Sequence, residues 1–324
     1  MTHQEQIALV DAKLAGSPND WQRKVLSEED VPDAAVVHGA GGVTPPMRVI
    51  SWNIRQGGGT RIAGQVATLD LHRPDVVALQ EVRAGTVPNY QSALSAIGLT
   101  HCLNSFALAA DTSVHVGGRR DGLFLASRWP LTPLPPTDFP IPYPERVLSA
   151  ILDAPFGQVE FHNAHIPNGT NHSWKKIETF EGIHKRLSQS SLVPRLLCGD
   201  FNSPMIELAD GTVITVAERL TVPGQMVVRR KWDPEGRWAS GEHLVMTGLL
   251  EFDLADVFRA LHGYRVPAFS FATSRNGRTF PRRFDHVFAS RSLNPVACQY
   301  LHTPRERGLS DHAPVEADFA PYHT

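Results

Sequence analysis

Long apolar runs are missing from this sequence of 324 residues, and cysteine is scarce. No stretch approaches the roughly 18 apolar residues that a membrane span requires, so no stable membrane insertion is expected. The first ten residues lack a basic segment followed by an apolar run, so we expect no signal peptide. Cys102, Cys198 and Cys298 are too few and too scattered for a disulfide framework or a zinc knuckle. We therefore expect a cytoplasmic protein.

Neither sign of charge dominates, since 31 Lys+Arg stand against 33 Asp+Glu and charged residues make up 20%. Together with 42% hydrophobic residues, this composition excludes a disordered polyelectrolyte. Residues 1–46 hold three basic and seven acidic residues, a balance of −4, whereas residues 227–310 hold 13 basic and 8 acidic residues, a balance of +5. A basic region beside an acidic site is compatible with a phosphate-bearing ligand and equally with an ordinary mixed surface.

The sequence contains no internal repeat, heptad pattern or broad apolar stripe, so we expect a monomer.

Residues 1–46 have the composition of an acidic, partly helical extension that ends in a Gly/Pro-rich linker. The main domain is expected over residues 47–324. Within it, residues 204–250 are irregular and rich in polar residues, Gly and Pro, which predicts a long insertion or a surface subdomain.

Short apolar runs predict strands, and apolar residues at helical spacing predict helices between them. The helices are expected at 61–72, at 88–99 and over 174–187, the last with Ser173 as its N-cap. The strands are expected at 47–54, 75–82, 122–127, 147–154, 159–166, 195–201, 270–273, 284–290 and 313–319. Strands outnumber helices and come in hairpin-like pairs, which predicts an α/β sandwich of two packed sheets with helices outside.

A set of polar residues falls at or near the ends of these apolar strands: Asn53, Glu81, His165, Asp200, Asn202, Asp285, His286, Asp311 and His312. Carboxylates on apolar strands need partners because a buried charge must be compensated. Several that converge from different strands would repel one another unless a cation lay between them, and hard oxygen ligands with few thiols favour Mg²⁺ or Mn²⁺. Each residue alone also fits a structural role, such as a strand-end ion pair or a turn. Their number in one chain favours a site.

The segments SWNI, LQEV, HIPNG, GDFN, FDH and SDH occur in the order typical of the endonuclease/exonuclease/phosphatase superfamily. The sequence resembles this superfamily over roughly residues 47–319, nearest to its exonuclease III-like branch. The resemblance implies a four-layer αββα sandwich of the deoxyribonuclease I type, with the site at one edge of the two sheets. It also implies a metal-dependent phosphoesterase in which Glu81 is the main metal ligand, with Asp311 and Asn53 beside it.

The same resemblance implies roles for the remaining polar residues. Asp200 orients or deprotonates the attacking water, and Asn202 binds a phosphate oxygen. His312 contacts the phosphate as an imidazolium whose other nitrogen is held by Asp285. His165 hydrogen-bonds the phosphate or acts near the leaving group. A carboxylate-paired core histidine would give the same sequence pattern as Asp285 and His312.

Other positions bear on the substrate. The resemblance places Asn168 on the phosphate side. Arg55 stands where exonuclease III-like members often carry Asp or Asn, so a second metal-side ligand is missing there. Arg282 stands where abasic-site enzymes place a Trp that packs against a flipped-out sugar, which counts against abasic-site cleavage. Arg282 and Arg283 are expected to bind the substrate.

The sequence therefore favours a Mg²⁺- or Mn²⁺-dependent nuclease that cleaves the nucleic-acid backbone by attack of an activated water. Basic residues that could follow a phosphate backbone, or form a solvated basic face, are Lys175, Lys176 and the arginines at 229, 230, 237, 275, 278, 282 and 283. Such contacts would make the affinity strongly dependent on salt.

Two alternatives remain open at this point. One is hydrolysis of a small-molecule or lipid phosphoester, for which Trp232 and Trp238 in the 204–250 segment could build a lipid-facing surface. The other is a non-catalytic binding protein on the same fold. That alternative predicts the loss of at least one metal or phosphate residue, whereas all six of the main ones are present: Glu81, Asp200, Asn202, Asp285, Asp311 and His312.

Overall fold

Two mixed six-stranded sheets form the centre of the molecule. The structure is a computed structural model that describes residues 46–109, 115–221, 225–229, 233, 235–275 and 278–320. In the first sheet the order is β17-β18-β1-β2-β4-β3, with bounds Pro295–Tyr300, Val315–Phe319, Met47–Asn53, Val76–Arg83, Asp121–Ser127 and His101–Asn104. In the second it is β13-β16-β8-β7-β6-β5, with bounds Ala255–Asp256, Asp285–Ala289, Arg195–Asp200, Gly157–His165, Val147–Ala154 and Leu131–Pro133. The expected N-terminal extension, apart from Pro46, lies outside the described residues.

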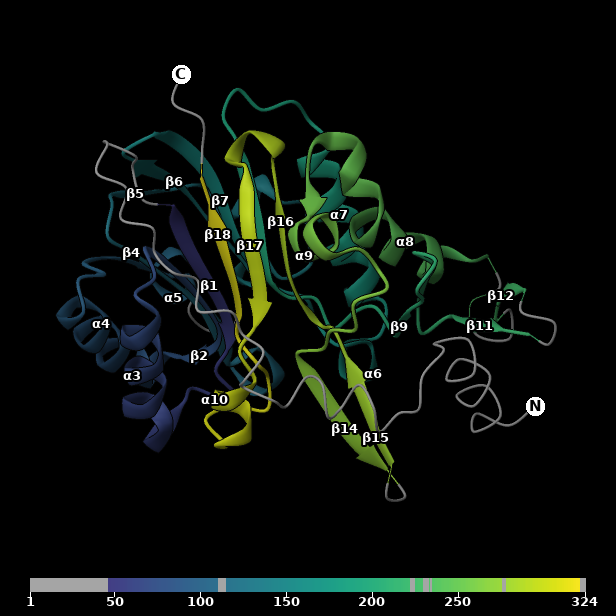
Figure 1. Cartoon of the computed structure of the whole chain (residues 1–324), viewed down its shortest axis with the longest axis horizontal. Coiled ribbons are helices and arrows are strands. Elements are labelled where there is room, and N and C mark those ends of the chain that lie inside the picture. The colour runs from purple at the N-terminus through teal and green to yellow at the C-terminus, as the bar shows by residue number, and fades with distance from the viewer. Residues whose placement is uncertain are drawn as a thin grey trace.

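Helices cover the outer face of each sheet (Figure 1). Helices α3 (Ile62–His72) and α4 (Val87–Ala96) lie against the first sheet, and α7 (Lys175–Leu187) and α8 (Arg237–Met246) lie against the second. Shorter helices are α5 (Ser105–Leu108), α6 (Gly169–His172), α9 (Val257–His262) and α10 (His302–Glu306). The layers follow one another as helices, sheet, sheet and helices, which confirms the expected αββα sandwich.

Three small antiparallel ribbons complete the fold. They are β9–β10 (Ile206–Glu207 with Val213–Ile214), β11–β12 (Glu218–Leu220 with Met226–Val228) and β14–β15 (Phe271–Arg275 with Arg278–Arg282). No helix among the described residues is long and apolar enough to cross a membrane.

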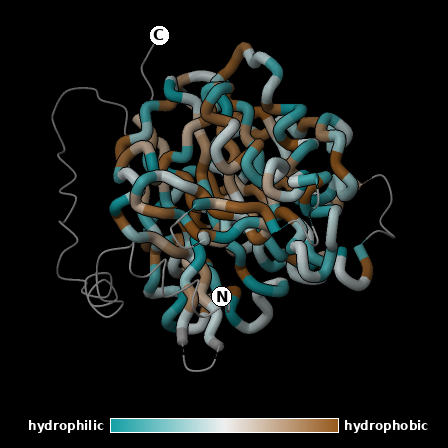
Figure 2. Tube along the Cα trace, turned by 90° about the vertical axis from the view of Figure 1, so that its right-hand side faces the viewer, coloured by the Kyte–Doolittle hydropathy of each residue, from teal (hydrophilic) through white to brown (hydrophobic). Residues whose placement is uncertain are grey.

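The central strands are buried on both faces, which explains why they appear in the sequence as continuous apolar runs. In β1, Val49 points into the core between the two sheets, whereas Ile50 and Trp52 point toward α3 and α4. In β8, Leu196 packs between the sheets and Leu197 packs under α7 and α8. Figure 2 shows the resulting concentration of apolar chain in the interior.

The 204–250 segment is more regular than the sequence predicts. It contains the β9–β10 and β11–β12 ribbons and all of α8, whose Trp238 and Val245 are buried against α7. Gly211 and Gly236 adopt a positive φ in turns between these elements, and α8 itself belongs to the outer helical layer. Trp232 lies outside the described residues. A second correction concerns Ser173, which follows α6 with a φ of 50° and does not cap α7 through its side chain.

The topology brings particular strand ends to one edge of the sandwich. Strands β1 and β2 are parallel and are joined through α3, and β7 and β8 are parallel and are joined through α7. Because parallel strands end at the same edge of a sheet, the carboxyl ends of each pair lie together. Strand β16 is antiparallel to β8 and starts there, with Asp285 opposite Asp200. The β14–β15 ribbon projects from this edge, beside α6, in Figure 1.

Candidate active site

The two sheets are joined at this edge by the side chain of Asn53, the last residue of β1. Its Nδ2 atom donates to Oδ2 of Asp200 at 2.9 Å and to Oε1 of Glu81 at 3.1 Å. Asn53 and Asp200 are about 1% exposed, whereas Glu81 is partly exposed. The sequence prediction that these strand ends converge is therefore confirmed in the structure.

Glu81 is held in an uncommon backbone conformation. Its φ is 61°, and the register between β2 and β4 shifts at this point between Gln80 and Val82, which indicates a bulge. A non-glycine residue in the left-handed region costs about 1–3 kcal/mol, and such residues concentrate at functional sites. The conformation directs the carboxylate toward the loop after β1, where Oε2 accepts the Gln56 N–H at 2.7 Å.

Asp200, the last residue of β8, lies at the centre of the site. Its Oδ2 atom is 3.7 Å from Nε2 of His165 and 3.9 Å from Nε2 of His312. Its Oδ1 atom accepts the Asn202 N–H at 2.9 Å. Burial, reinforced by the nearby Asp285 carboxylate and opposed by His312, raises the pKa of Asp200 to about 7. A carboxyl group with this pKa can accept a proton near neutral pH.

His312 forms a buried pair with Asp285, with 2.7 Å between Nδ1 and Oδ2. Burial opposes the charged ring, but the carboxylates of Asp285 and Asp200 outweigh it and raise the pKa of His312 to about 10. The imidazole is therefore protonated at neutral pH, and its Nε2–H faces Asp200. The backbone carbonyl of His312 accepts from the Trp52 indole at 3.0 Å, which fixes the residue against β1.

His165 has the opposite electrostatic character because its partner is a cation. Nη1 of Arg146 lies 2.8 Å from Nδ1 of His165, and burial followed by the charge of Arg146 places the pKa of His165 well below its ordinary value. Since a guanidinium only donates, Nδ1 must be the acceptor and the proton sits on Nε2, toward Asp200. Arg146 was not expected at the site. Arg146 is only 3% exposed, so its side chain turns inward. Its position just before a strand does not indicate this in the sequence.

The two expected asparagines, Asn202 and Asn168, are held by different elements. Asn202 has a φ of 50°, and its Nδ2 atom donates to the Ile166 carbonyl at 3.0 Å. Asn168 is the N-cap of α6, because its Oδ1 atom accepts the Asn171 N–H at 2.9 Å. Asn202 is thus joined to the ends of β7 and β8, and Asn168 to the start of α6.

Asp311 lies toward the solvent side of the site. Its Oδ2 atom is 3.7 Å from Nε of Arg55, and the two side chains are 42% and 49% exposed respectively. The preceding Ser310 donates from its hydroxyl to the Asn53 carbonyl at 2.6 Å, which ties this loop to the end of β1. Arg55, noted in the sequence as a departure, therefore places a cation beside a predicted metal ligand.

The comparisons with known proteins agree with this arrangement. A model of the Endonuclease/Exonuclease/phosphatase family matches residues 50–312, which include every residue of the site. The chain belongs to this family. It is thus a phosphoesterase of the endonuclease/exonuclease/phosphatase type. Comparison with curated protein sequences finds no match.

Solved structures of the family share the fold. An AP endonuclease from Archaeoglobus fulgidus matches with a TM-score of 0.59 at 19% identity, over 84% of this chain and 99% of the other. An endonuclease/exonuclease/phosphatase protein from Beutenbergia cavernae matches with 0.55 at 20% identity, over 86% and 73%. TDP2 from D. rerio, in complex with a single-strand DNA product, matches with 0.55 at 16% identity, over 85% and 98%. At these identities the likeness shows the fold alone.

A group of three side chains in this family member could hold a metal ion. The potential ligand atoms of Asp200, Asp285 and His312 all lie within 4.8 Å of one another, and all three residues are buried. The Oδ1 atom of Asp285 is buried and has no hydrogen-bond partner in the part of the chain that the structure describes. The ring nitrogen of His312, however, carries the proton shared with Asp285, and a metal would have to displace that proton. The carboxylate and amide oxygens of the predicted set, Glu81, Asn53 and Asp311, also suit Mg²⁺ or Mn²⁺ and need no such displacement.

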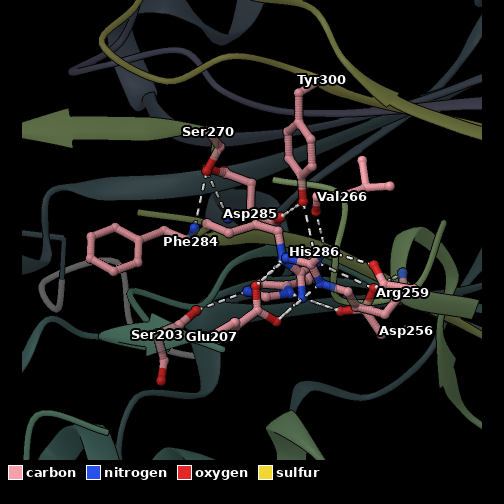
Figure 3. Close-up of polar contacts among 12 residues, drawn as sticks. Ser203, Glu207, Asp256, Arg259, Val266, Ser270, Phe284, Asp285, His286 and Tyr300 are labelled. Carbon is pink, nitrogen blue, oxygen red and sulfur yellow. Dashed lines mark hydrogen bonds and ion pairs between the residues drawn. The ribbon is translucent and has the colours of Figure 1, made fainter. Parts of the chain in front are cut away.

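One predicted substrate contact requires correction. The Arg283 side chain is 3% exposed and donates to the carboxylates of both Glu207 and Asp256. Arg259 also binds Glu207, and His286 binds Asp256, as Figure 3 shows. We therefore remove Arg283 from the predicted substrate-binding residues, because its guanidinium is committed to a buried ionic cluster that joins β9, β13 and β16.

The structure also shows the surroundings of two other basic residues, Arg282 and Lys176. Arg282, in β15, is partly buried and donates to the Pro281 carbonyl at 2.9 Å. Lys176, expected on a basic helix face, is 4% exposed, and its ammonium group points inward to Asn202 and Glu242. Lys176 therefore does not present its charge to solvent, whereas Lys175 on the same helix is exposed.

Proposed function

We propose that this phosphoesterase is a divalent-metal-dependent nuclease that hydrolyses phosphodiester bonds of nucleic acid. The observation that carries the proposal is the position of Asp200. Its carboxylate is buried, faces the Nε2 atoms of a charged and a neutral histidine, and is hydrogen-bonded to Asn53 from the other sheet. Hydrolysis needs a group that takes a proton from water and donors for the phosphoryl oxygens, and these residues supply both.

Asp200 is assigned to the attacking water. Its pKa is raised to about 7, so its carboxylate can take up a proton near neutral pH. The His165 and His312 nitrogens lie at 3.7 and 3.9 Å, which is longer than a hydrogen bond. Both N–H groups therefore keep the capacity to donate to a substrate oxygen.

His312 and His165 are assigned to the phosphate. The imidazolium of His312, held by Asp285, supplies a full positive charge close to the phosphoryl oxygens. His165, held neutral with its proton on Nε2 by Arg146, supplies a directed N–H without a charge of its own. Asn202, whose peptide N–H binds Asp200, brings its side-chain amide to the same region.

Glu81, Asn53 and Asp311 would hold Mg²⁺ or Mn²⁺. When bound, such an ion neutralises charge on the phosphate and stabilises the leaving oxygen. The contacts of Glu81 support its role, because its strained backbone, its bond from Asn53 and its bond from the Gln56 N–H together fix one carboxylate at the end of β2. Arg55 adds a further cation beside Asp311.

Nucleic acid is the proposed substrate for two reasons. Two of the similar structures are named as an AP endonuclease and as TDP2 with a single-strand DNA product. In this chain, the β14–β15 ribbon that carries Arg282 projects from the site edge, where a polymer could contact it beyond the reacting phosphate (Figure 1).

The test is a gel assay with end-labelled single-stranded DNA, duplex DNA and a duplex with one abasic site, each with Mg²⁺, Mn²⁺ or EDTA. Cleavage that requires the metal and is lost in Asp200→Asn supports the nuclease, and the product sizes distinguish endonucleolytic from exonucleolytic action. If none of these DNA substrates, and no end-labelled RNA assayed in the same way, is cut under any condition, the proposal is wrong. The same variants would then be assayed on small and lipid phosphoesters.

A further inference from the structure

A buried ion pair lies directly behind the loop that carries Asn202. The Nζ atom of Lys176, in α7, donates to the Asn202 carbonyl at 2.8 Å and lies 3.1 Å from Oε1 of Glu242, in α8. The other carboxylate oxygen of Glu242 accepts the hydroxyl of Ser203. Two helices of the outer layer thus contact two consecutive residues of the active-site loop.

The pair is fully enclosed. The side chains of Lys176 and Glu242 are 5% and 1% exposed. The Trp238 indole donates to Oε1 of Glu242 at 2.6 Å, so the carboxylate receives an indole, an ammonium and a hydroxyl group. A buried pair of this kind contributes little net stability compared with apolar residues of the same volume, because desolvation of the two charges offsets their attraction. Stability alone therefore gives weak reason for its presence.

The strained backbone conformation of Asn202 requires stabilising contacts. Its φ of 50° lies in the left-handed region, which is costly for a side chain other than glycine. Three hydrogen bonds oppose relaxation: the peptide N–H to Asp200, the side-chain amide to the Ile166 carbonyl, and the carbonyl to Lys176. The first two join the residue to the ends of β8 and β7. The Lys176 bond is the one that holds the residue from the helical layer.

We propose that the Lys176–Glu242 pair is a positioning device for Asn202, which fixes the carbonyl of Asn202 so that its amide faces the substrate phosphate. Lys176 sets the position of the carbonyl, and Glu242 sets the position of Lys176 and of the following Ser203. The inference rests on the proposed function. It also gives α8 a role at the site, through Glu242.

The test uses Lys176→Met together with Glu242→Gln, which removes both charges and so leaves neither ion buried alone. The glutamine amide oxygen introduced at position 242 can accept from Trp238, and its NH2 group can donate to the Ser203 hydroxyl oxygen, so both neighbours keep a hydrogen-bond partner. The main losses are then the contact with the Asn202 carbonyl and the two charges. The substrate is bis(p-nitrophenyl) phosphate with saturating metal. We expect kcat to fall roughly 10- to 100-fold, because small misplacements of a site residue have effects of that size. KM should stay within about threefold, because Asn202 acts chiefly in the transition state.

The matched control is Arg186→Met with Glu160→Gln. This ion pair also joins α7 to a neighbouring element, and it does not touch Asn202. It should lower Tm without changing kcat per folded molecule. If both double variants change kcat equally, or if Lys176→Met/Glu242→Gln keeps the wild-type kcat, the positioning role is refuted. If the wild-type protein itself does not hydrolyse the phosphodiester, the proposed function is wrong. That result is distinct from a loss of the positioning role, which requires an active wild-type protein.

Discussion

The side-chain amide of Asn53 donates to Oδ2 of Asp200 at 2.9 Å and so connects the end of β1 in the first sheet with the end of β8 in the second. The same amide donates to Glu81 at 3.1 Å. One neutral residue therefore stands between the carboxylate assigned to the water and the carboxylate assigned to the metal. An amide can bind both without adding a negative charge, whereas a third carboxylate would repel them.

Replacement of Asn53 by Ala should lower kcat by about 100-fold, since both carboxylates lose the donor that orients them. Asn104→Ala is a suitable control, because Asn104 ends β3 of the same sheet and its side chain caps α5 by accepting the Ala107 N–H. The control should lose about 1 kcal/mol of stability and keep its kcat. Comparable kcat losses in the two variants would mean that the Asn53 effect is merely structural.

Asp200→Asn should abolish turnover while the fold is retained. Burial already opposes the ionised form of Asp200, so its replacement by a neutral residue of the same shape should not destabilise the protein above neutral pH. Activity and Tm are measured together, with Asp153→Asn on the exposed part of β6 as the control. Turnover near the wild-type rate in Asp200→Asn would remove Asp200 from the mechanism.

Asp285→Asn should lower the pKa of His312 from about 10 toward its ordinary value, because the carboxylate at 2.7 Å is lost. The imidazolium form, which the wild-type protein keeps at neutral pH, would then be depleted as the pH rises above about 6.5. NMR titration of the His312 ring in metal-free protein measures this change directly. An unchanged His312 titration in the variant would show that another group sustains its charge.

The pH dependence of stability can be tested away from the site, at His243 in α8. The hydrogen bond to Glu218 at 3.1 Å raises the pKa of His243, although burial opposes it. Because the folded-state pKa is above the unfolded one, the stabilisation is complete below about pH 6.5 and is lost as the pH rises through the folded-state pKa. His243→Gln should therefore lower Tm more at about pH 6 than at about pH 9, by the equivalent of roughly 0.5–1 kcal/mol. Equal effects at the two pH values would contradict the assignment.

The sequence was sufficient to predict the layers of the fold because its central strands are buried on both faces. Runs such as 47–54 and 195–201 are apolar at their centres, and they match β1 and β8 closely. Strand β17 was not predicted; it lies at the edge of its sheet, where Val296, Ala297 and Gln299 are exposed and show no regular alternation. Helix α8 was not predicted either, because Gly241 and its polar neighbours hide an apolar face that only the contact with α7 defines.

The site was predictable to the extent that its residues follow apolar strands. Asn53, Glu81, Asp200 and Asp285 converge because the topology brings those strand ends together, as the spacing along the chain suggested. Side-chain direction was not predictable. Arg146 turns inward to a histidine, although nothing in its neighbourhood distinguishes it from a surface arginine.

The adjacent residues Arg282 and Arg283 allow a direct test of the difference between an arginine that turns into the core and one that remains available to the substrate. Arg283→Met leaves the Glu207 and Asp256 carboxylates without their shared cation, and should reduce the free energy of unfolding by about 3–5 kcal/mol. Arg283→Lys keeps the charge but loses the two-pronged contact, so its loss should be intermediate. Arg282→Met breaks no ion pair that the structure describes, and should instead weaken DNA binding at low salt with little change in stability. Urea unfolding and DNA affinity are measured on all three variants. A stable Arg283→Met protein with weakened DNA binding would return Arg283 to the substrate surface and contradict the buried cluster.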